Sequence, residues 1–260
     1  MIHESKGGYV KSEIHKGIAT VEFFHPQGNS LPGPLLRELE KEIHSHGNNT
    51  EVRVILIRSG GDSSFCGGAS FEELSNIQTA EEGTAFFNGF ANLINTMRKA
   101  PKLIVGRIHG KCVGGGVGLA AAMDYAIAVE SAEVRLSELT IGIGPFVVGP
   151  AVERKIGTSS FTQLAIDSAL WRNGDWARRK GLFAELHPNT ESMDESVHRL
   201  THTLALSSPE ATAELKKIFW KGTEHWDHLL PERAAISGRL IVSEPARAAI
   251  ARIRSKVKVS

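Results

Sequence analysis

The stretch GGGVGLA at residues 114–120 decides how this chain is interpreted, and it follows the apolar run LIVGRI at residues 103–108. Three adjacent glycines let a backbone turn sharply out of a strand and bring unobstructed N–H groups close to a ligand. The apolar residues after them predict a helix, so these N–H groups lie at its positive end, which attracts an oxygen anion. A second glycine-rich segment, FCGGASF at residues 65–71, also follows a strand-like run, at residues 52–58. Two such corners predict two backbone donors for the negative charge that develops on a carbonyl oxygen during a reaction.

The periodicity of the apolar residues predicts an α/β fold. Leu35, Leu39 and Ile43 recur at helical spacing, whereas other apolar runs are short and typical of buried strands. Strands that alternate with helices indicate parallel strands joined by right-handed crossovers. After about residue 189 the pattern becomes almost wholly helical. The expected strands are 10–14, 18–24, 52–58, 103–108, 125–129 and 134–136, and the expected helices are 35–48, one marked by apolar residues at 86–97, one from 116 onward, 193–206, 209–221, 226–239 and 244–257.

Together with the segment LSELTIG at 136–142, which contains Glu138, and the turn HPQGNSL at 25–31, the two glycine corners resemble the enoyl-CoA hydratase/isomerase family, also called the crotonase superfamily. The likeness follows the family's order and spacing through nearly the whole chain. It implies a ββα spiral core at residues 1–190, which carries the active site, and a helical C-terminal region at residues 191–260. In the family that region packs against neighbouring subunits, so the resemblance also implies a homotrimer or a hexamer.

Composition narrows the classes of partner and the cellular compartment. Thirty basic and 29 acidic residues nearly cancel, so net charge does not favour nucleic acid or a membrane surface as partner. The N-terminus shows no basic segment followed by an apolar one, and no apolar stretch approaches membrane-spanning length, so we expect a cytoplasmic protein. The two cysteines, Cys66 and Cys112, indicate no disulfide framework and favour a reducing compartment. Nothing in the sequence requires a metal or a redox cofactor, since His225 and His228 lack the spacing of a metal site.

The resemblance implies an acyl-CoA thioester as substrate, in which coenzyme A is part of the substrate and no separate cofactor is needed. The backbone N–H groups of Ala69 and Gly115 match the family's oxyanion hole, which holds the thioester oxygen. Ser70 stands where many family members have aspartate, and it keeps a hydroxyl that can cap a helix N-terminus. From the residues alone, the glycines could instead only close tight turns. The resemblance further implies substrate or CoA contacts at Gly67, Gly68, Ser70, Phe71, Glu72, Gly114, Gly116, Gly118 and Phe146.

Family hydratases use two glutamates that flank one water molecule, and this chain retains only one of them. The second glutamate of the motif is Glu138, whereas Gly118 stands at the position of the first. Glycine has no side chain that accepts or donates a proton, so hydration by two glutamates is not available in its usual form. Neighbouring apolar residues are expected to bury Glu138 partly and to raise its pKa toward neutrality. We also expect Gly118→Glu to restore the missing partner and to shift products toward the hydrated species.

A single carboxylate favours a double-bond shift, in which one base removes a proton from C2 and returns it at C4. The family's mitochondrial-type isomerases also lack the first glutamate, and they carry a Pro-Phe pair close to the position of Pro145 and Phe146 here. The related 3-hydroxyisobutyryl-CoA hydrolases need an aspartate where this chain has Phe146, which argues against thioester hydrolysis. Three interpretations stay open: enoyl-CoA hydratase as the family-level label, 3,2-enoyl-CoA isomerase, and a catalytically silent acyl-CoA-binding member. The basic last helix either pairs with CoA phosphates or is a solvated face, and its cations are Arg247, Arg252, Arg254, Lys256 and Lys258.

Overall fold

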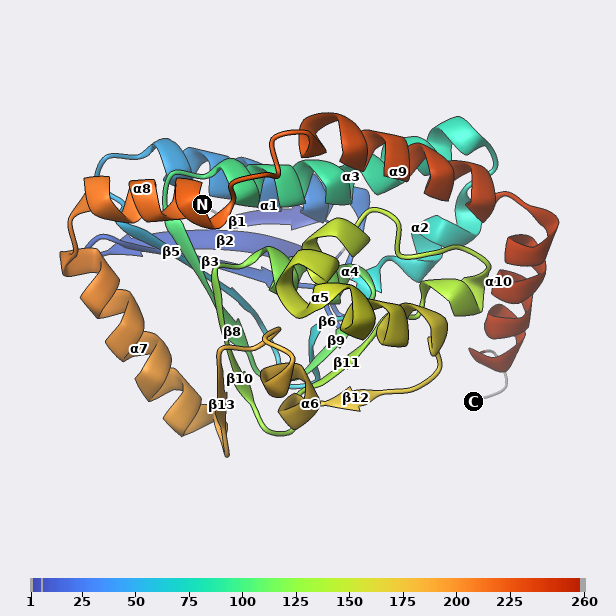
Figure 1. Cartoon of the computed structure of the whole chain (residues 1–260). Coiled ribbons are helices and arrows are strands. Elements are labelled where there is room, and N and C mark those ends of the chain that lie inside the picture. Colours follow the sequence, from blue (N-terminus) through green and yellow to red (C-terminus); the bar gives the residue numbers. More distant parts are fainter. Residues whose placement is uncertain (1, 6, 258–260) are drawn as a thin grey trace.

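The computed structural model describes residues 2–5 and 7–257 of the chain (Figure 1). The strands are β1 (Ile2–Ser5), β2 (Gly8–His15), β3 (Ile18–Phe24), β4 (Ser30–Leu31), β5 (Val54–Ser59), β6 (Ser64–Cys66), β7 (Gly68–Ala69), β8 (Leu103–Ile108), β9 (Lys111–Val113), β10 (Tyr125–Val129), β11 (Glu133–Arg135), β12 (Arg172–Asn173) and β13 (Glu185–His187). The helices are α1 (Gly33–Asn48), α2 (Phe71–Asn76), α3 (Ala80–Lys99), α4 (Gly115–Ala122), the 3₁₀ helix η1 (Glu138–Ile141), α5 (Gly149–Ile166), α6 (Gly174–Arg179), α7 (Thr190–Leu206), α8 (Pro209–Phe219), α9 (Trp226–Ile241) and α10 (Glu244–Val257). Within this described part of the chain, no helix has the length and apolar character needed to cross a membrane.

Seven strands form the main sheet in the order β1-β2-β3-β5-β8-β10-β13. The first three strands are antiparallel, whereas every neighbouring pair from β3 to β13 is parallel. β5 and β8 are buried along almost their whole length, as expected for parallel strands that helices cover on both faces.

A second, smaller sheet turns the chain into a spiral. In this sheet β6, β9 and β11 lie side by side, in the same order as β5, β8 and β10 in the main sheet. Each turn of the chain therefore contributes one strand to each sheet and then a helical segment, which is α2, α4 or η1. This repeated unit confirms the ββα spiral core that the resemblance implies. Because β6, β9 and β11 are parallel, the three segments that follow them start from one edge of the small sheet, where both glycine corners and Glu138 lie.

The C-terminal helix α9 packs on α3 of the same chain, and the two lie side by side in Figure 1. The helices approach closely where Gly83 meets Gly238, since a Cβ added to Gly83 would lie 2.8 Å from the Gly238 Cα. Polar contacts fix the other end, where Arg98 Nη2 of α3 lies 2.6 Å from an Asp227 carboxylate oxygen. This docking is followed by α10, which contacts η1, the segment that carries Glu138.

A buried charge pair attaches α8 to the main sheet. Lys216 Nζ lies 2.6 Å from Asp124 Oδ2, and the two side chains are 3% and 6% exposed. Asp124 also accepts hydrogen bonds from Trp220 Nε1 at 2.8 Å and from the backbone N–H of Ile104 at 2.8 Å. Burial lowers the pKa of Lys216, and the carboxylate of Asp124 offsets part of that effect. Such a fully partnered buried pair fixes the position of a helix, and breaking one partner is costly.

The expected strands and helices are all present, although several of their ends differ. The periodicity missed α5 and the short elements β1, β4, β6, β7, β9, β12, β13, α2, α6 and η1. Gly157 interrupts α5 with a φ of 76°, which breaks the helical spacing of its apolar residues. The remaining missed elements are only two to six residues long, too short for a periodic signal. Whether residues 191–260 pack against neighbouring subunits stays a prediction.

Candidate active site

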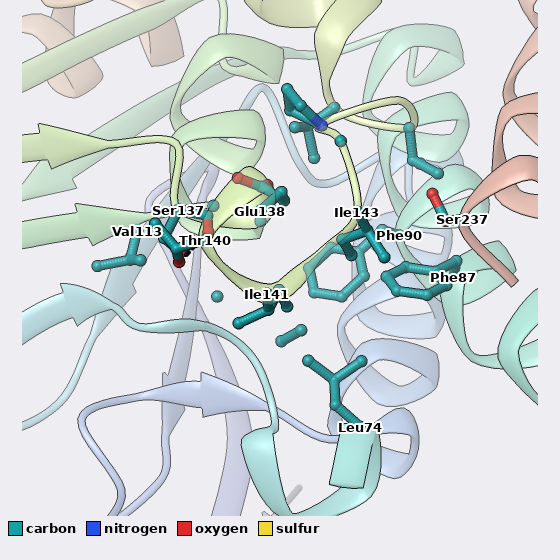
Figure 2. Close-up of a pocket in the computed structure, with 18 of the residues that line it drawn as sticks. Leu74, Phe87, Phe90, Val113, Ser137, Glu138, Thr140, Ile141, Ile143 and Ser237 are labelled. Atoms are coloured by element: carbon teal, nitrogen blue, oxygen red, sulfur yellow. Dashed lines mark hydrogen bonds between the residues drawn. The ribbon is translucent and has the colours of Figure 1, made fainter. Parts of the chain in front are cut away.

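A cavity of about 220 Å³ lies where the ends of the small-sheet strands meet α3 and the C-terminal helices (Figure 2). Both glycine corners and the segment after β11 contribute to its wall. Phe87 and Phe90 of α3 and Ile253 of α10 make much of the remaining wall apolar. Among the described residues that line the cavity, Glu138 is the one acidic side chain. The cavity therefore suits an apolar chain that is held beside a single carboxylate.

The two glycine corners touch each other at the cavity wall. Gly68 has a φ of +84°, and a Cβ added to it would lie 2.5 Å from the carbonyl oxygen of Val113 and 3.2 Å from the backbone nitrogen of Gly115. A side chain at this position would be strained and would also push the corners apart, so glycine is required here. The absence of a side chain brings Ala69 close to the start of α4.

Each corner leaves one backbone N–H without an acceptor inside its own element. Directly after β7, the N–H of Ser70 bonds to Leu31 O of the neighbouring strand β4 at 3.3 Å. Because alternate residues of a strand point their N–H groups to opposite edges, the N–H of Ala69 points away from that neighbour. Gly115 is the first residue of α4, where a helix offers no internal acceptor. Both residues line the cavity, so the arrangement offers it two backbone donors.

The carboxylate of Glu138 lies beside the second corner. A Cβ added to Gly114 would lie 3.0 Å from Glu138 Oε1. Oε2 is buried and has no hydrogen-bond partner among the residues that the structure describes. Burial raises the pKa of Glu138 to about 7, although its own backbone N–H partly offsets this effect. A carboxylate with this pKa takes up and returns a proton readily near neutral pH.

Gly118 lies in α4 behind the cavity wall and does not line the cavity. Val148, at the N-terminus of α5, lines the cavity in front of it. A Cβ added to Gly118 would lie 2.4 Å from Val148 Cγ1 and 2.6 Å from Val148 Cβ. The expectation that Gly118→Glu alone supplies a second carboxylate therefore meets a steric obstacle that the sequence does not reveal.

The other candidate residues divide into those that line the cavity and those that support its wall. Phe71 and Phe146 line it, as do Gly67, Gly68 and Gly114. Ser70 caps the N-terminus of α2 by accepting a hydrogen bond from Glu73 N at 3.3 Å, which confirms its expected capping ability. Ser70, Glu72 and Gly116 lie outside the wall, so their contact with substrate or CoA stays a prediction.

The basic last helix α10 is only partly described. Arg247 Nη2 donates to Gln78 O at 3.1 Å, and Arg252 and Arg254 are exposed. Lys258 and the side chain of Lys256 lie outside the described residues. Binding of CoA phosphates by this helix stays a prediction.

Sequence reasoning missed several residues that shape the cavity. Val148 stands two residues after Phe146, but no local pattern shows which way its side chain points. Ser237 of α9 and Ile253 of α10 also line the cavity (Ser237 is labelled in Figure 2). Both come from helices whose position depends on long-range packing, so no spacing in the sequence could reveal them. In the ranges 2–5 and 7–257, no group of three or more His, Cys, Asp or Glu residues could hold a metal ion.

Comparison with known proteins agrees with this geometry. The model of the family described as enoyl-CoA hydratase/isomerase matches residues 13–247. The "Probable enoyl-CoA hydratase" of Bacillus subtilis (strain 168) is 28% identical over 247 residues, which are 94% of this chain and 95% of that protein. The mitochondrial methylglutaconyl-CoA hydratase of Mus musculus is 30% identical over 189 residues, which are 72% of this chain and 60% of that protein. The crystal structure of an enoyl-CoA hydratase from Bacillus halodurans is similar in fold, with a TM-score of 0.86 at 22% identity over 94% of this chain and 99% of that chain.

Proposed function

Because the chain belongs to the enoyl-CoA hydratase/isomerase family, we propose that it acts on an enoyl-CoA thioester with Glu138 as its single acid–base group. Family membership makes the chain an enzyme of enoyl-CoA chemistry, and the choice between hydration and double-bond migration depends on the cavity. The observation that carries the proposal is the buried Oε2 of Glu138, which has no partner among the described residues, in the same cavity wall as Ala69 and Gly115.

In the proposed complex, the thioester oxygen accepts hydrogen bonds from the N–H groups of Ala69 and Gly115. Three features support this assignment: the contact between the two corners at Gly68, the lack of an acceptor for each N–H within its own element, and the position of both residues in the cavity wall. Backbone donors held in place by tight packing stabilise an oxyanion without moving during the reaction, and losing one such donor typically costs about 3 kcal/mol.

Glu138 then performs both proton transfers of a 3-enoyl to 2-enoyl shift. Its carboxylate takes a proton from C2 of the 3-enoyl thioester, and the electron pair of that C–H bond delocalises onto the thioester oxygen as a dienolate. The protonated Glu138 returns the proton to C4, the double bond moves to C2–C3, and the charge on the oxygen is discharged. A pKa near 7 suits both steps, because the group must first accept and then donate.

Isomerisation is favoured over hydration because Val148 fills the space in front of Gly118, and Phe146 adds an apolar group to the cavity wall. Water addition in the two-glutamate manner needs a second side chain that holds the water. Hydration with Glu138 alone is the second candidate, and the names of the relatives in Bacillus subtilis and Mus musculus favour it.

Product analysis separates the candidates. Purified protein is incubated with a 3-enoyl-CoA and, separately, with a 2-enoyl-CoA, and the products are identified by mass spectrometry. We expect conversion of the 3-enoyl to the 2-enoyl thioester and little 3-hydroxyacyl-CoA. Rapid formation of 3-hydroxyacyl-CoA from the 2-enoyl substrate would favour the hydratase, and binding of both thioesters without turnover would favour a silent member.

We further propose a homotrimer or hexamer in the cytoplasm with no separate cofactor. Support for self-association comes from α8, where Leu215, Ile218 and Phe219 expose apolar side chains, with Ile218 66% exposed. Exposed apolar groups clustered on one helix commonly mark a protein interface. Light scattering of the purified chain tests this proposal, and a well-behaved monomer at micromolar concentration would contradict it.

A further inference from the structure

The contact between Gly118 and Val148 joins two elements that are distant in the sequence. Gly118 is buried within α4, and Val148 is the residue that precedes α5. The position of a Cβ on Gly118 is 2.4 Å from Val148 Cγ1 and 2.6 Å from Val148 Cβ, but 3.5 Å from Val148 Cα. Any side chain at position 118 therefore conflicts with the side chain of Val148 and not with its backbone.

Neither element has room to retreat. At the start of α4, a Cβ on Gly115 would lie 2.3 Å from the Phe90 ring and one on Gly116 would lie 2.3 Å from Cys66 O, so this helix is packed tightly on two sides. At the start of α5, Gly149 N bonds to Pro145 O at 2.8 Å and Val152 N bonds to Val148 O at 3.1 Å. Interiors packed this closely do not absorb extra atoms without strain.

We infer that Val148 is a specificity-determining residue, which together with Gly118 keeps the cavity limited to one carboxylate. Its isopropyl group occupies the volume that a second acidic side chain from α4 would need in order to reach the cavity. Val148 is 4% exposed and lines the cavity, so it also presents an apolar surface where such a carboxylate would hold a water molecule. The inference rests on the proposed function, because it explains why this site moves a proton and does not add water.

The packing part of the inference is tested by a double-mutant cycle in thermal stability, a readout that does not depend on activity. The variants are Gly118→Ala, Val148→Gly and the double variant, with Val147→Gly as the matched control, since Val147 is also 4% exposed and lines the cavity. Alanine normally stabilises a helix relative to glycine, so a loss in Gly118→Ala is diagnostic. We expect Gly118→Ala to lower the melting temperature by at least about 5 °C in the wild-type background and by much less in the Val148→Gly background.

The reaction part is tested with Gly118→Glu in the presence and absence of Val148→Gly. We expect the double variant to form 3-hydroxyacyl-CoA from a 2-enoyl-CoA at least about tenfold faster than either single variant.

Equal melting temperatures for Gly118→Ala and wild type, or equal rescue by Val147→Gly, would overturn the inference. A coupled pair that gains no hydration would overturn the role of Val148 in the choice of reaction. Rapid hydration by the wild-type protein would instead overturn the proposed function and leave the stability cycle unaffected.

Discussion

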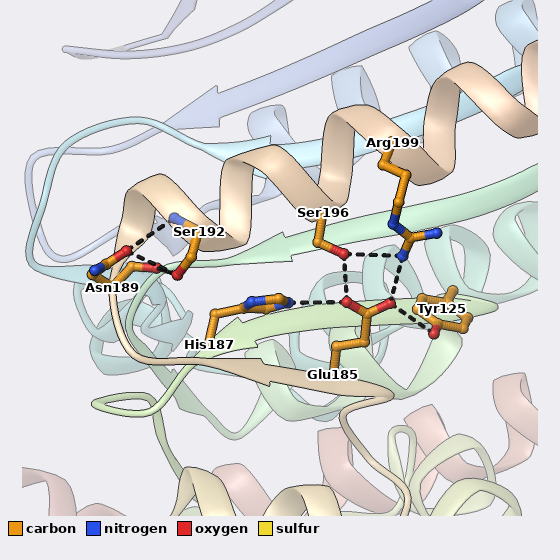
Figure 3. A network of polar contacts seen from close by, with 7 residues as sticks. All are labelled: Tyr125, Glu185, His187, Asn189, Ser192, Ser196 and Arg199. Carbon is orange, nitrogen blue, oxygen red and sulfur yellow. Dashed lines mark hydrogen bonds and ion pairs between the residues drawn. The ribbon is translucent and has the colours of Figure 1, made fainter.

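Two glutamates of this chain, Glu138 and Glu185, show how the surroundings of a carboxylate separate a reactive group from a structural one. Glu138 has a buried oxygen without a partner, and burial raises its pKa to about 7. Glu185 in β13 is surrounded by donors (Figure 3): Tyr125 Oη and His187 Nε2 lie at 2.9 Å and Arg199 Nη2 at 3.1 Å, and Ser196 Oγ also donates to it. Burial opposes the charge of Glu185, but hydrogen bonds from Ser196, His187 and Tyr125 lower its pKa overall.

The two glutamates differ in how many hydrogen-bond donors their carboxylate oxygens have. A carboxylate with several donors has its charge stabilised in place and gains little by taking a proton. The carboxylate of Glu185 joins β10, β13 and α7 at the β13 edge of the main sheet. The carboxylate of Glu138 has one buried oxygen without a partner and only its own backbone N–H as a donor, which makes it a stronger base than an exposed glutamate. Function is therefore expected at Glu138 and structural support at Glu185.

The largest expected effect is on turnover. Glu138→Gln keeps the shape of the side chain but removes the group that carries the proton, so we expect enoyl-CoA turnover to fall by about 10²–10⁴-fold or more. Binding of a saturated acyl-CoA, measured by calorimetry, is expected to change little because the backbone donors remain. Glu185→Gln is the matched control and should retain turnover close to wild type. Wild-type turnover by Glu138→Gln would move the catalytic assignment elsewhere.

The pH dependence of turnover follows from the raised pKa of Glu138. The base must be ionised to take the C2 proton, so kcat/KM should rise with pH and level off above about 7. Below that pH, each unit is expected to cost about tenfold. A profile that is flat from pH 5 to 8, while the protein stays folded, would show that Glu138 does not titrate as described.

The same pKa shift predicts a pH-dependent stability. An acid whose pKa rises from 4.5 to about 7 on folding holds its proton more tightly in the folded state, so its contribution is complete below pH 4.5 and declines as the pH rises to 7. The shift corresponds to roughly 3 kcal/mol. Urea unfolding of wild type and Glu138→Gln should therefore show a difference that grows in favour of the variant between these pH values. A difference that is independent of pH would contradict the shift.

Glu185 should show a smaller effect with the opposite dependence on pH. Because its pKa is lowered, it contributes stability above its ordinary value of 4.5, and this contribution is lost as the pH falls through its folded-state pKa. We expect Glu185→Gln to reduce the free energy of unfolding by about 1–2 kcal/mol at pH 7 through loss of charge-assisted hydrogen bonds. Glu195→Gln is the control, because Glu195 is exposed on the neighbouring helix α7. Equal stability of the two variants would remove the structural role of Glu185.

Local signals in the sequence predicted much of the fold and the reactive role of Glu138. Apolar periodicity predicted most helices and the central strands, and the glycine corners together with Glu138 predicted residues of the cavity wall. The raised pKa of Glu138 was also expected from its apolar neighbours, and the structure confirms it.

Long-range packing explains what the sequence could not reveal. Gly118 is visible in the sequence as a missing carboxylate, but the contact that fills its space comes from Val148, whose position depends on the direction of α5. Ser237 and Ile253 reach the cavity only because α9 docks on α3. The donors around Glu185 likewise come from β10, β13 and α7, which no local spacing connects.

The central claim, that one carboxylate carries the proton from C2 to C4, is tested most directly by isotope transfer. A 3-enoyl-CoA deuterated at C2 is turned over by the wild-type protein, and the early product is analysed by mass spectrometry and NMR for deuterium at C4. We predict 2-enoyl-CoA that carries deuterium at C4, because Glu138 returns to C4 the deuteron that it removed from C2. An early product without deuterium at C4, accompanied by 3-hydroxyacyl-CoA as the main species, would contradict the account and indicate water addition.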